Sequence, residues 1–288
     1  MSVSDLLNSK QFSVTVEVIP PKGNDLTFLM EELERVKGRV DAIVVRELPS
    51  SVMRLGALST GCRLKEKGFN PIVEFTCRDR NRLALQADLL NASVLGIEDI
   101  LVTQGEDIKI GDHPEAKAVF DLNESELLQA VEKMREGFDL AGNSLQGSPH
   151  LRAGASIVLD EGNLERVIDE LEKKVDLGAC FILTSPVFTP RVLERFMRGV
   201  GGFNLPILAS VLLLKSAGMA NYISKNVPGI SIPDETVKRL LKSSDRGRTS
   251  VEIAAEMIMS LKSVCRGVNI LPVGWESKVP ALLDLTKI

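Results

Sequence analysis

Two clusters of polar residues follow short apolar runs and could do chemistry together. Residues 76–80 read Thr-Cys-Arg-Asp-Arg after the run at 71–76, and residues 103–107 read Thr-Gln-Gly-Glu-Asp after the run at 99–103. If both runs are neighbouring parallel strands, the two clusters lie at the carboxyl edge of one sheet, where α/β proteins build their sites. The stretch from 71 to 122 therefore predicts a site at that edge.

Glu17 is a third candidate, near the end of the β-branched run at 12–19. A carboxylate at the end of a strand faces the mouth of a barrel, and its apolar neighbours Val16, Val18 and Ile19 would raise its pKa. Such a group can transfer a proton near neutral pH. The alternative is a structural glutamate paired with an arginine or lysine, and the residues alone leave both open.

The segment 104–123 is long for a loop in a compact domain, and loops of this length are usually functional or disordered. Gln104, Gly105 and Glu106 offer a donor, a small residue and an anion, a set that suits a planar heterocycle with a polar edge. A solvated turn is the alternative. Farther along, His113 and Lys117 beside Asp112 could bind a phosphate or a ribose.

The four cysteines are isolated and lack metal-ligand spacing, so the sequence predicts a reduced cytoplasmic protein with no metal site. Cys77, beside two arginines, is the one whose thiolate could be stabilised. A net charge of −4 without a basic run argues against nucleic acid as a partner. The N-terminus lacks a signal peptide, and the apolar run at 205–214 is too short to cross a membrane.

Eight apolar runs alternate with helical patterns along the chain. The predicted strands are residues 12–19, 42–45, 71–76, 99–103, 152–158, 180–184, 206–212 and 268–271. The predicted helices are residues 26–36 with Asp25 as N-cap, 52–67, 81–90, 124–138, 163–175, 190–198 and 216–226, and an extra pair at 234–241 and 249–263. This order predicts a single-domain (β/α)8 TIM barrel over residues 1–288, with an extra helical segment before the last strand.

An open doubly wound sheet is the alternative architecture. The absence of a dinucleotide-binding fingerprint weakens it, because Gly199, Gly201 and Gly202 follow a helix and not a strand.

The motifs VEVIPPKG, EFTCRDRNRLALQADLL, GDHPEAKAVFDL and LEKKVDLGACFILTSPVF resemble the methylenetetrahydrofolate reductase family, most closely its short acetogen-like members, from Val16 to Thr286. The resemblance implies a flavin-containing barrel that interconverts methylenetetrahydrofolate and methyltetrahydrofolate. The implied cofactor is FAD, with FMN as the alternative. The family's barrels commonly self-associate, so a homo-oligomer is expected.

The resemblance also assigns roles to individual residues. Glu17 matches the acid that helps to open the substrate's five-membered ring, and Glu106 matches an aspartate beside flavin and folate. Lys174 matches a lysine that meets the flavin phosphates. The remaining positions assigned to the flavin are Thr76, Gln104, Gly105, Gly154 and Ala155, together with His113 and Lys117 of the loop.

Several positions depart from the family pattern. Ser185, assigned to the substrate, replaces the glutamine that better-known members use toward folate. Glu74 stands where a histidine beside the flavin is expected, and residues 208–215 lack the aromatic that stacks on pterin and nicotinamide. These changes argue against direct use of NAD(P)H and favour a partner subunit as electron donor.

Two other functions stay open from the sequence. A folate-binding or methyl-transferring barrel within a larger complex would explain the lost positions, although it gains little from a buried acid at position 17. An aldolase or lyase would need a Schiff-base lysine at a strand end, for which Lys215 is the candidate.

Overall fold

The computed structural model describes residues 3–227 and 229–288 as one closed barrel of eight parallel strands. The strands pair in chain order, and the first pairs with both the second and the eighth. Their bounds are β1 Ser13–Val18, β2 Ala42–Val45, β3 Pro71–Thr76, β4 Asp99–Thr103, β5 Arg152–Ile157, β6 Ile182–Pro186, β7 Ile207–Leu212 and β8 Gly267–Leu271. The predicted TIM barrel is confirmed, and each strand overlaps its predicted range.

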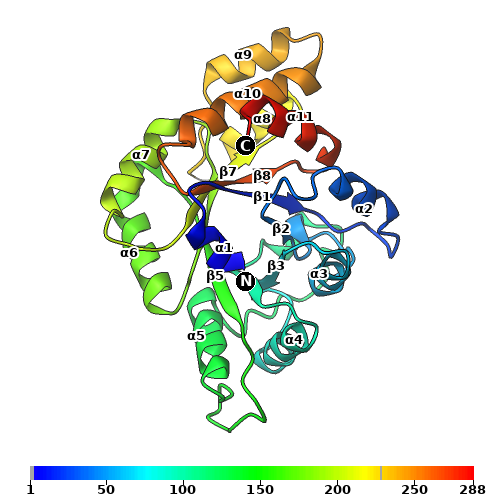
Figure 1. Ribbon diagram of the computed structural model, residues 1–288, viewed down its shortest axis with the longest axis vertical. Coiled ribbons are helices and arrows are strands. Elements are labelled where there is room, and N and C mark those ends of the chain that lie inside the picture. The colour runs from blue at the N-terminus through cyan, green and yellow to red at the C-terminus, as the bar shows by residue number, and fades with distance from the viewer. Residues whose placement is uncertain (1–2, 228) are drawn as a thin grey trace.

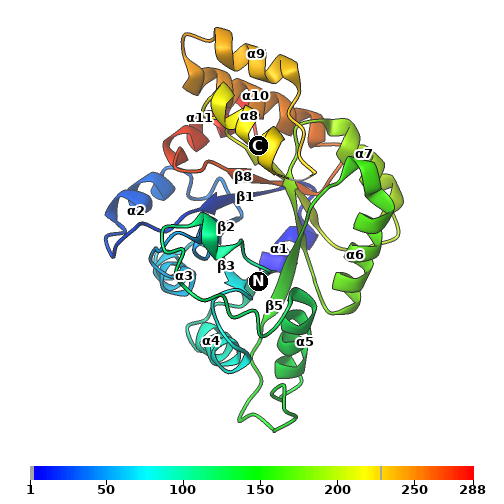
Figure 2. The same cartoon turned by 180° about the vertical axis from the view of Figure 1, so that it is seen from behind.

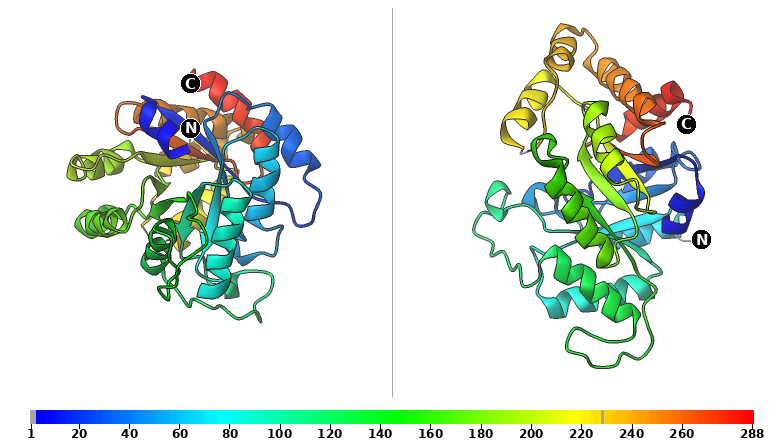
Figure 3. Two further views of the ribbon diagram at one scale, coloured as in Figure 1. Left: turned by 60° about the horizontal axis from the view of Figure 1, so that its bottom comes forward. Right: turned by 90° about the vertical axis from the view of Figure 1, so that its left-hand side faces the viewer.

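Helices surround the barrel (Figure 1). Those that follow strands are α2 Thr27–Glu34, α3 Ala57–Glu66, α4 Arg82–Val94, α5 Glu124–Arg135, α6 Leu164–Asp176, α7 Pro190–Gly199, α8 Ala217–Asn226 and α11 Val279–Thr286. The predicted extra segment before the last strand is confirmed as α9 Asp234–Lys242 and α10 Arg246–Leu261. Figures 2 and 3 show α8, α9 and α10 grouped on one side of the barrel.

Successive side chains along each strand point alternately into two apolar cores, one between the strands and the helices and one inside the barrel. Val16 and Val18 of β1 pack toward the helices in the larger core, whereas Val44 and Ile72 pack inside the barrel. The interior core also takes in Val3 from helix α1 Val3–Ser9, which lies across the barrel in Figure 1. Because side chains alternate along a strand, Glu17 must face the interior between its two outward valines.

Three details differ from the sequence expectations. Helices α1 and α11 were not predicted, because their short apolar patterns resemble loops at the ends of the chain. Asp25 is not the N-cap of α2, which is Leu26, although the Asp25 carboxylate accepts a hydrogen bond from the Thr27 amide at 2.9 Å.

The helix predicted over 52–67 begins only at Ala57. The segment before it forms a 3-10 turn, η1 Pro49–Ser51, in which Leu48, Ser50 and Ser51 have φ of 43°, 55° and 56°. Left-handed backbone at three non-glycine residues is costly, so surrounding contacts must hold it. One of these contacts is at the start of α3, where the Glu47 carboxylate accepts a hydrogen bond from the Ala57 amide at 2.6 Å.

Candidate functional site

The carboxyl ends of β1 to β4 bring an arginine and three glutamates together at the mouth of the barrel. Arg46 follows β2, and its Nε lies 2.8 Å from an oxygen of Glu74 on β3. Its Nη1 lies 3.2 Å from Glu17 on β1, and its Nη2 lies 4.0 Å from Glu106 after β4. We call these four residues the Arg46 network. It contains both residues that the sequence assigned to catalysis.

Glu74 anchors the Arg46 network to the sheet. One carboxylate oxygen accepts a hydrogen bond from the Thr103 hydroxyl at 2.8 Å, and the other accepts one from the Glu47 amide at 2.7 Å. The residue is only 2% exposed. With the guanidinium as a further donor, its charge is well compensated, as a buried carboxylate requires.

Glu17 has the electrostatics of a proton donor. Burial raises the pKa of its carboxyl above the ordinary value, Arg46 opposes this shift, and the neighbouring charge of Glu74 adds to it. Burial disfavours the charged form of Arg46, but Glu17 and Glu74 outweigh that effect and raise the pKa of the guanidinium. The guanidinium therefore stays charged while Glu17 can hold a proton.

The loop after β4 closes over the loop after β2. The Ser51 hydroxyl donates to the Asp107 carbonyl at 2.9 Å, and the Met53 amide donates to Asp112 at 3.0 Å. Asp112 also pairs with Lys22 from the loop after β1 and with His113, and these hydrogen bonds lower the pKa of its carboxyl. The predicted long loop is thus ordered by its neighbours.

Contact between these two loops is close enough to restrict the side chain at position 111. A β-carbon placed on Gly111 would lie 1.8 Å from the Ser51 carbonyl oxygen. A cavity of about 230 Å³ lies between the two loops, against Leu48, Met53, Ile108 and His113.

Arg78, which the sequence placed in the first polar cluster without a role, is a buried anchor of the mouth. It is 1% exposed, and its guanidinium donates to both oxygens of Asp79, at 2.7 and 2.8 Å. It also donates to the Leu48 carbonyl at 3.3 Å and to the Ser51 hydroxyl at 2.9 Å. These bonds hold the left-handed turn after β2.

Three residues assigned to a flavin lie near Arg78, and each has a partner within the protein. Thr76 donates its hydroxyl to Asp79 at 3.0 Å. Gly105 has φ of 84°, and a β-carbon there would lie 2.8 Å from that of Arg78. The backbone amide of the exposed Gln104 donates to the Glu124 carboxylate at 2.7 Å. Close packing against Arg78 is therefore enough to explain why position 105 is a glycine, and no ligand is needed.

The residues assigned on β5 and α6 are held by packing and ion pairs within the protein. Gly154 faces the barrel interior, where a β-carbon would lie 2.2 Å from the Phe181 ring. Ala155 packs on the helix-facing side of β5. Lys174 is 5% exposed and is held by Glu124 at 2.8 Å and Glu170 at 2.7 Å.

Lys174 also donates to the Ser156 carbonyl at 2.6 Å. Two carboxylates and a carbonyl therefore take up its charge and its donors. His113 and Lys117 of the loop after β4 are both exposed.

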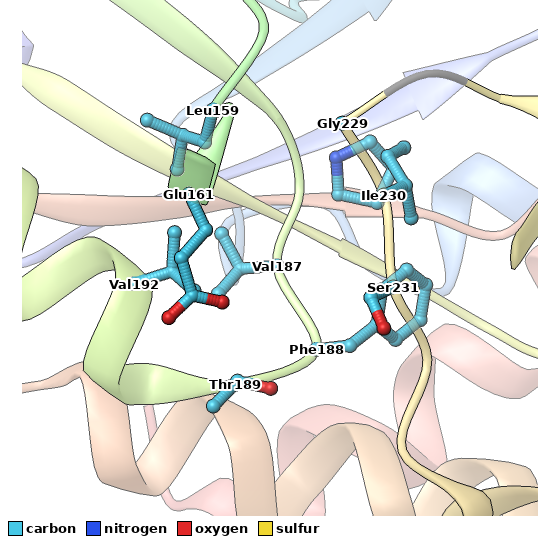
Figure 4. A pocket seen from close by; sticks show the side chains of 10 residues that line it. Leu159, Glu161, Val187, Phe188, Thr189, Val192, Gly229, Ile230 and Ser231 are labelled. Atoms are coloured by element: carbon cyan, nitrogen blue, oxygen red, sulfur yellow. The ribbon is translucent and has the colours of Figure 1, made fainter. Parts of the chain in front are cut away.

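Ser185, assigned to the substrate, lies on β6 and accepts a hydrogen bond from the Leu159 amide at 3.0 Å. Next to it is a cavity of about 100 Å³. Figure 4 shows Phe188, Thr189 and Ile230 around this cavity, with the Glu161 carboxylate on one side. The strand that carries Ser185 thus contributes to a second opening at the carboxyl end of the barrel.

These contacts do not fit a flavin nucleotide. Lys174, the lysine that the resemblance assigns to the flavin phosphates, has its charge taken up by two carboxylates and is not free to meet a phosphate. The flavin ring needs an open polar surface, but Glu74, which stands where the resemblance expects a histidine beside the flavin, is bound by Arg46. The flavin assignment of these residues stays a prediction.

Arg46 is the residue at the centre of the network that the sequence did not single out. It follows β2 directly, at the same edge as the two clusters, and this position was the available signal. The expectation that two arginines stabilise a thiolate at Cys77 is wrong. Cys77 is fully buried, and burial raises the pKa of its thiol to about 12.

A closed eight-stranded barrel with a buried acid at the carboxyl ends of its strands defines a TIM-barrel protein with an enzyme-like site. The family model described as methylenetetrahydrofolate reductase matches residues 2–273. The chain therefore belongs to the methylenetetrahydrofolate reductase family, as its motifs predicted. A search of the curated proteins found no match. Within the described residues, no helix is long and apolar enough to cross a membrane.

Solved structures with the same fold come from several functional classes. One is described as an uncharacterized protein from Clostridium thermocellum that binds two copies of 5-methyl-5,6,7,8-tetrahydrofolic acid. It has a TM-score of 0.68 and 17% identity, and the match covers 100% of this chain and 99% of that one. 2,3-Dimethylmalate lyase has a TM-score of 0.54 and 10% identity, with 99% and 86% covered. The Bacillus cereus spore cortex-lytic enzyme SleL has a TM-score of 0.52 and 10% identity, with 96% and 74% covered.

Proposed function

We propose that this chain acts on the pair 5,10-methylenetetrahydrofolate and 5-methyltetrahydrofolate at the carboxyl-end mouth of its barrel, with Glu17 as the acid. The observation that carries this proposal is the Glu17 carboxyl itself. It is 8% exposed at the end of β1, and burial raises its pKa. A carboxyl that keeps its proton toward neutral pH can protonate a substrate nitrogen.

The folate substrate has two nitrogens for which such an acid is useful. When the five-membered ring of the methylene form opens, the bond from the bridging carbon to N10 breaks, N10 takes the proton, and a cation remains at N5. When a methyl group leaves N5, a proton on that nitrogen makes it a better leaving group. Either reaction is helped by a proton donor beside the ring, and this is the role that we propose for Glu17.

Family membership favours the first of these reactions. Methylenetetrahydrofolate reductases convert the methylene form to the methyl form with hydride that passes through a flavin, FAD or FMN. The electron source predicted for this chain is a partner subunit rather than NAD(P)H. The resemblance supports this candidate, a cytoplasmic, homo-oligomeric reductase, and the family match adds to that support.

The Arg46 network favours the second candidate, a barrel that binds folate or transfers its methyl group. Its residues bind one another where the resemblance expects a flavin. The similar protein from Clostridium thermocellum, which binds two copies of 5-methyltetrahydrofolate, lends further support to a folate ligand. Both candidates share the folate and the acid.

Calorimetric binding of 5-methyltetrahydrofolate between pH 5 and 9 tests the shared part. The wild-type chain should bind it with an affinity that changes with pH, because burial raises the pKa of Glu17 and the proton on this carboxyl would be shared with the bound folate. Glu17→Gln, which cannot exchange a proton, should bind with a flat pH profile. Absence of folate binding in the wild-type chain would refute the proposed function. An unchanged pH profile in Glu17→Gln would refute the role of Glu17.

Turnover of methylenetetrahydrofolate with a reduced artificial electron donor and added flavin separates the two candidates. A reductase should form the methyl product, and Glu17→Gln should lower the rate about 100-fold or more, as expected for a removed general acid. A folate-binding or methyl-transferring barrel should form none. Sedimentation of the purified chain would show whether it self-associates.

A further inference from the structure

The Arg46 side chain is a fixed part of the mouth. It is 24% exposed, and its guanidinium has carboxylates on three sides, from Glu17, Glu74 and Glu106. A planar guanidinium with its donors taken up in this way is held in one orientation. The surface presented at this point is therefore an ion pair and not an open polar shelf.

Glu74 could not easily turn away to admit a ligand. It receives hydrogen bonds from the Thr103 hydroxyl and the Glu47 amide in addition to Arg46. Two segments, the one after β2 and strand β4, thus hold one carboxylate of β3 between them. Breaking such a buried pair is strongly unfavourable, because each partner would lose its compensation.

The charge of the mouth also disfavours a ring edge that is rich in hydrogen-bond acceptors. The carboxylates of Glu74 and Glu106 lie beside Arg46, and the second guanidinium nearby, of Arg78, pairs with Asp79 and lies 3.7 Å from Glu106. The polar edge of a flavin ring carries mostly acceptors, which carboxylates repel. The pterin ring of a reduced folate is neutral, and its amide and amine groups can donate to a carboxylate.

We propose that the Arg46–Glu74 pair takes the place of a flavin ring in this chain, so that the mouth binds the pterin of a reduced folate and no flavin. This proposal rests on the proposed function only for the identity of the folate. The exclusion of flavin follows from the contacts and charges of the pair, and the two parts are measured separately.

The test is equilibrium dialysis of the full-length chain against FMN, FAD and riboflavin, with 5-methyltetrahydrofolate in parallel. The expected result is a colourless protein that retains none of the three flavins at 100 μM (about the level of a weak metabolite site) and retains the folate. Flavin in the protein as purified, or retention of any of the three, would overturn the proposal. Riboflavin lacks phosphate, so its retention alone would show that the pair leaves room for the ring.

The variant Arg46→Ala/Glu74→Gln tests the role of the pair directly. It removes the guanidinium and one negative charge, and the glutamine side chain can still form hydrogen bonds with the Thr103 hydroxyl and the Glu47 amide. FMN affinity should rise at least tenfold over the wild-type chain, and an unchanged affinity in a folded variant would overturn the proposal. Arg63→Ala/Glu66→Ala, which removes an exposed Arg–Glu pair on α3, is the matched control and should not alter binding.

Thermal melting establishes that the variants fold. If Arg46→Ala/Glu74→Gln does not fold, the wild-type dialysis still decides the proposal. If the wild-type chain binds neither folate nor flavin, the proposed function is refuted and the exclusion of flavin stands. If the wild-type chain binds both folate and flavin, the exclusion of flavin is refuted and the proposed function stands.

Discussion

Arg46 and Glu74 form a 2.8 Å ion pair across the carboxyl ends of two neighbouring strands, although they are 28 positions apart in the chain. The pair matters because a third residue, Glu17, shares the same guanidinium. A single arginine thereby couples the proposed acid to a carboxylate that the sheet holds rigidly.

Stability should depend on pH through Glu17. Burial raises the pKa of the carboxyl in the folded chain above its ordinary value of 4.5, so the folded state holds this proton more tightly than the unfolded state. The contribution of the protonated group is fully present below pH 4.5 and is lost as pH rises through the folded-state pKa.

Urea unfolding of the wild-type chain and Glu17→Gln at several pH values would measure this dependence. The free energy of unfolding of Glu17→Gln, relative to that of the wild-type chain, should increase as pH rises, by up to about 1.4 kcal/mol per pH unit. Glu31→Gln, at an exposed position on α2, is the control and should run parallel to the wild type. A constant difference between Glu17→Gln and the wild type would contradict the raised pKa.

Gly105→Ala should destabilise the chain by about 2 to 4 kcal/mol. Part of this loss comes from a side chain at φ 84°, and part from a β-carbon that meets Arg78 at 2.8 Å. Gly142→Ala, at φ 90° with no atom within 4 Å, isolates the backbone contribution and should cost about 1 kcal/mol. Chemical denaturation gives both values, and equal losses would show that the Arg78 contact is unimportant.

Lys174→Met should destabilise the chain by about 2 to 4 kcal/mol without any ligand present. The substitution leaves the Glu124 carboxylate and the Ser156 carbonyl without their partner. Lys173→Met, one residue earlier on the exposed side of α6, should change stability by less than about 0.5 kcal/mol. If both variants behave alike, Lys174 is not a structural ion-pair partner, and its assignment to a phosphate regains support.

Cys77 should resist thiol reagents in the folded chain. Its thiol is fully buried with a pKa of about 12, whereas Cys62 on α3 is partly exposed. With a disulfide-exchange reagent at pH 8, Cys62 should be modified first, and Cys77 only on unfolding. Cys62→Ser is the matched variant: fast labelling that survives this change and maps to Cys77 would show that the site opens readily.

The sequence by itself determined the architecture. Eight short β-branched runs alternating with amphipathic patterns leave few ways to bury both faces of the strands, and a closed barrel is the economical one. It also determined the family, and it placed Glu17 at the mouth, because alternation along a strand of valines fixes the direction of each side chain.

Only the tertiary structure decided which residues meet. Arg46 lies in a segment that looks like an ordinary polar loop, and its three carboxylates come from three other parts of the chain. Gly105 and Gly154 looked like positions that admit a ligand, yet Arg78 and the Phe181 ring fill the space beside them. Local sequence patterns record which residues are small or charged. Close packing and the pairing of buried charges depend on neighbours distant in the sequence, and these define the site.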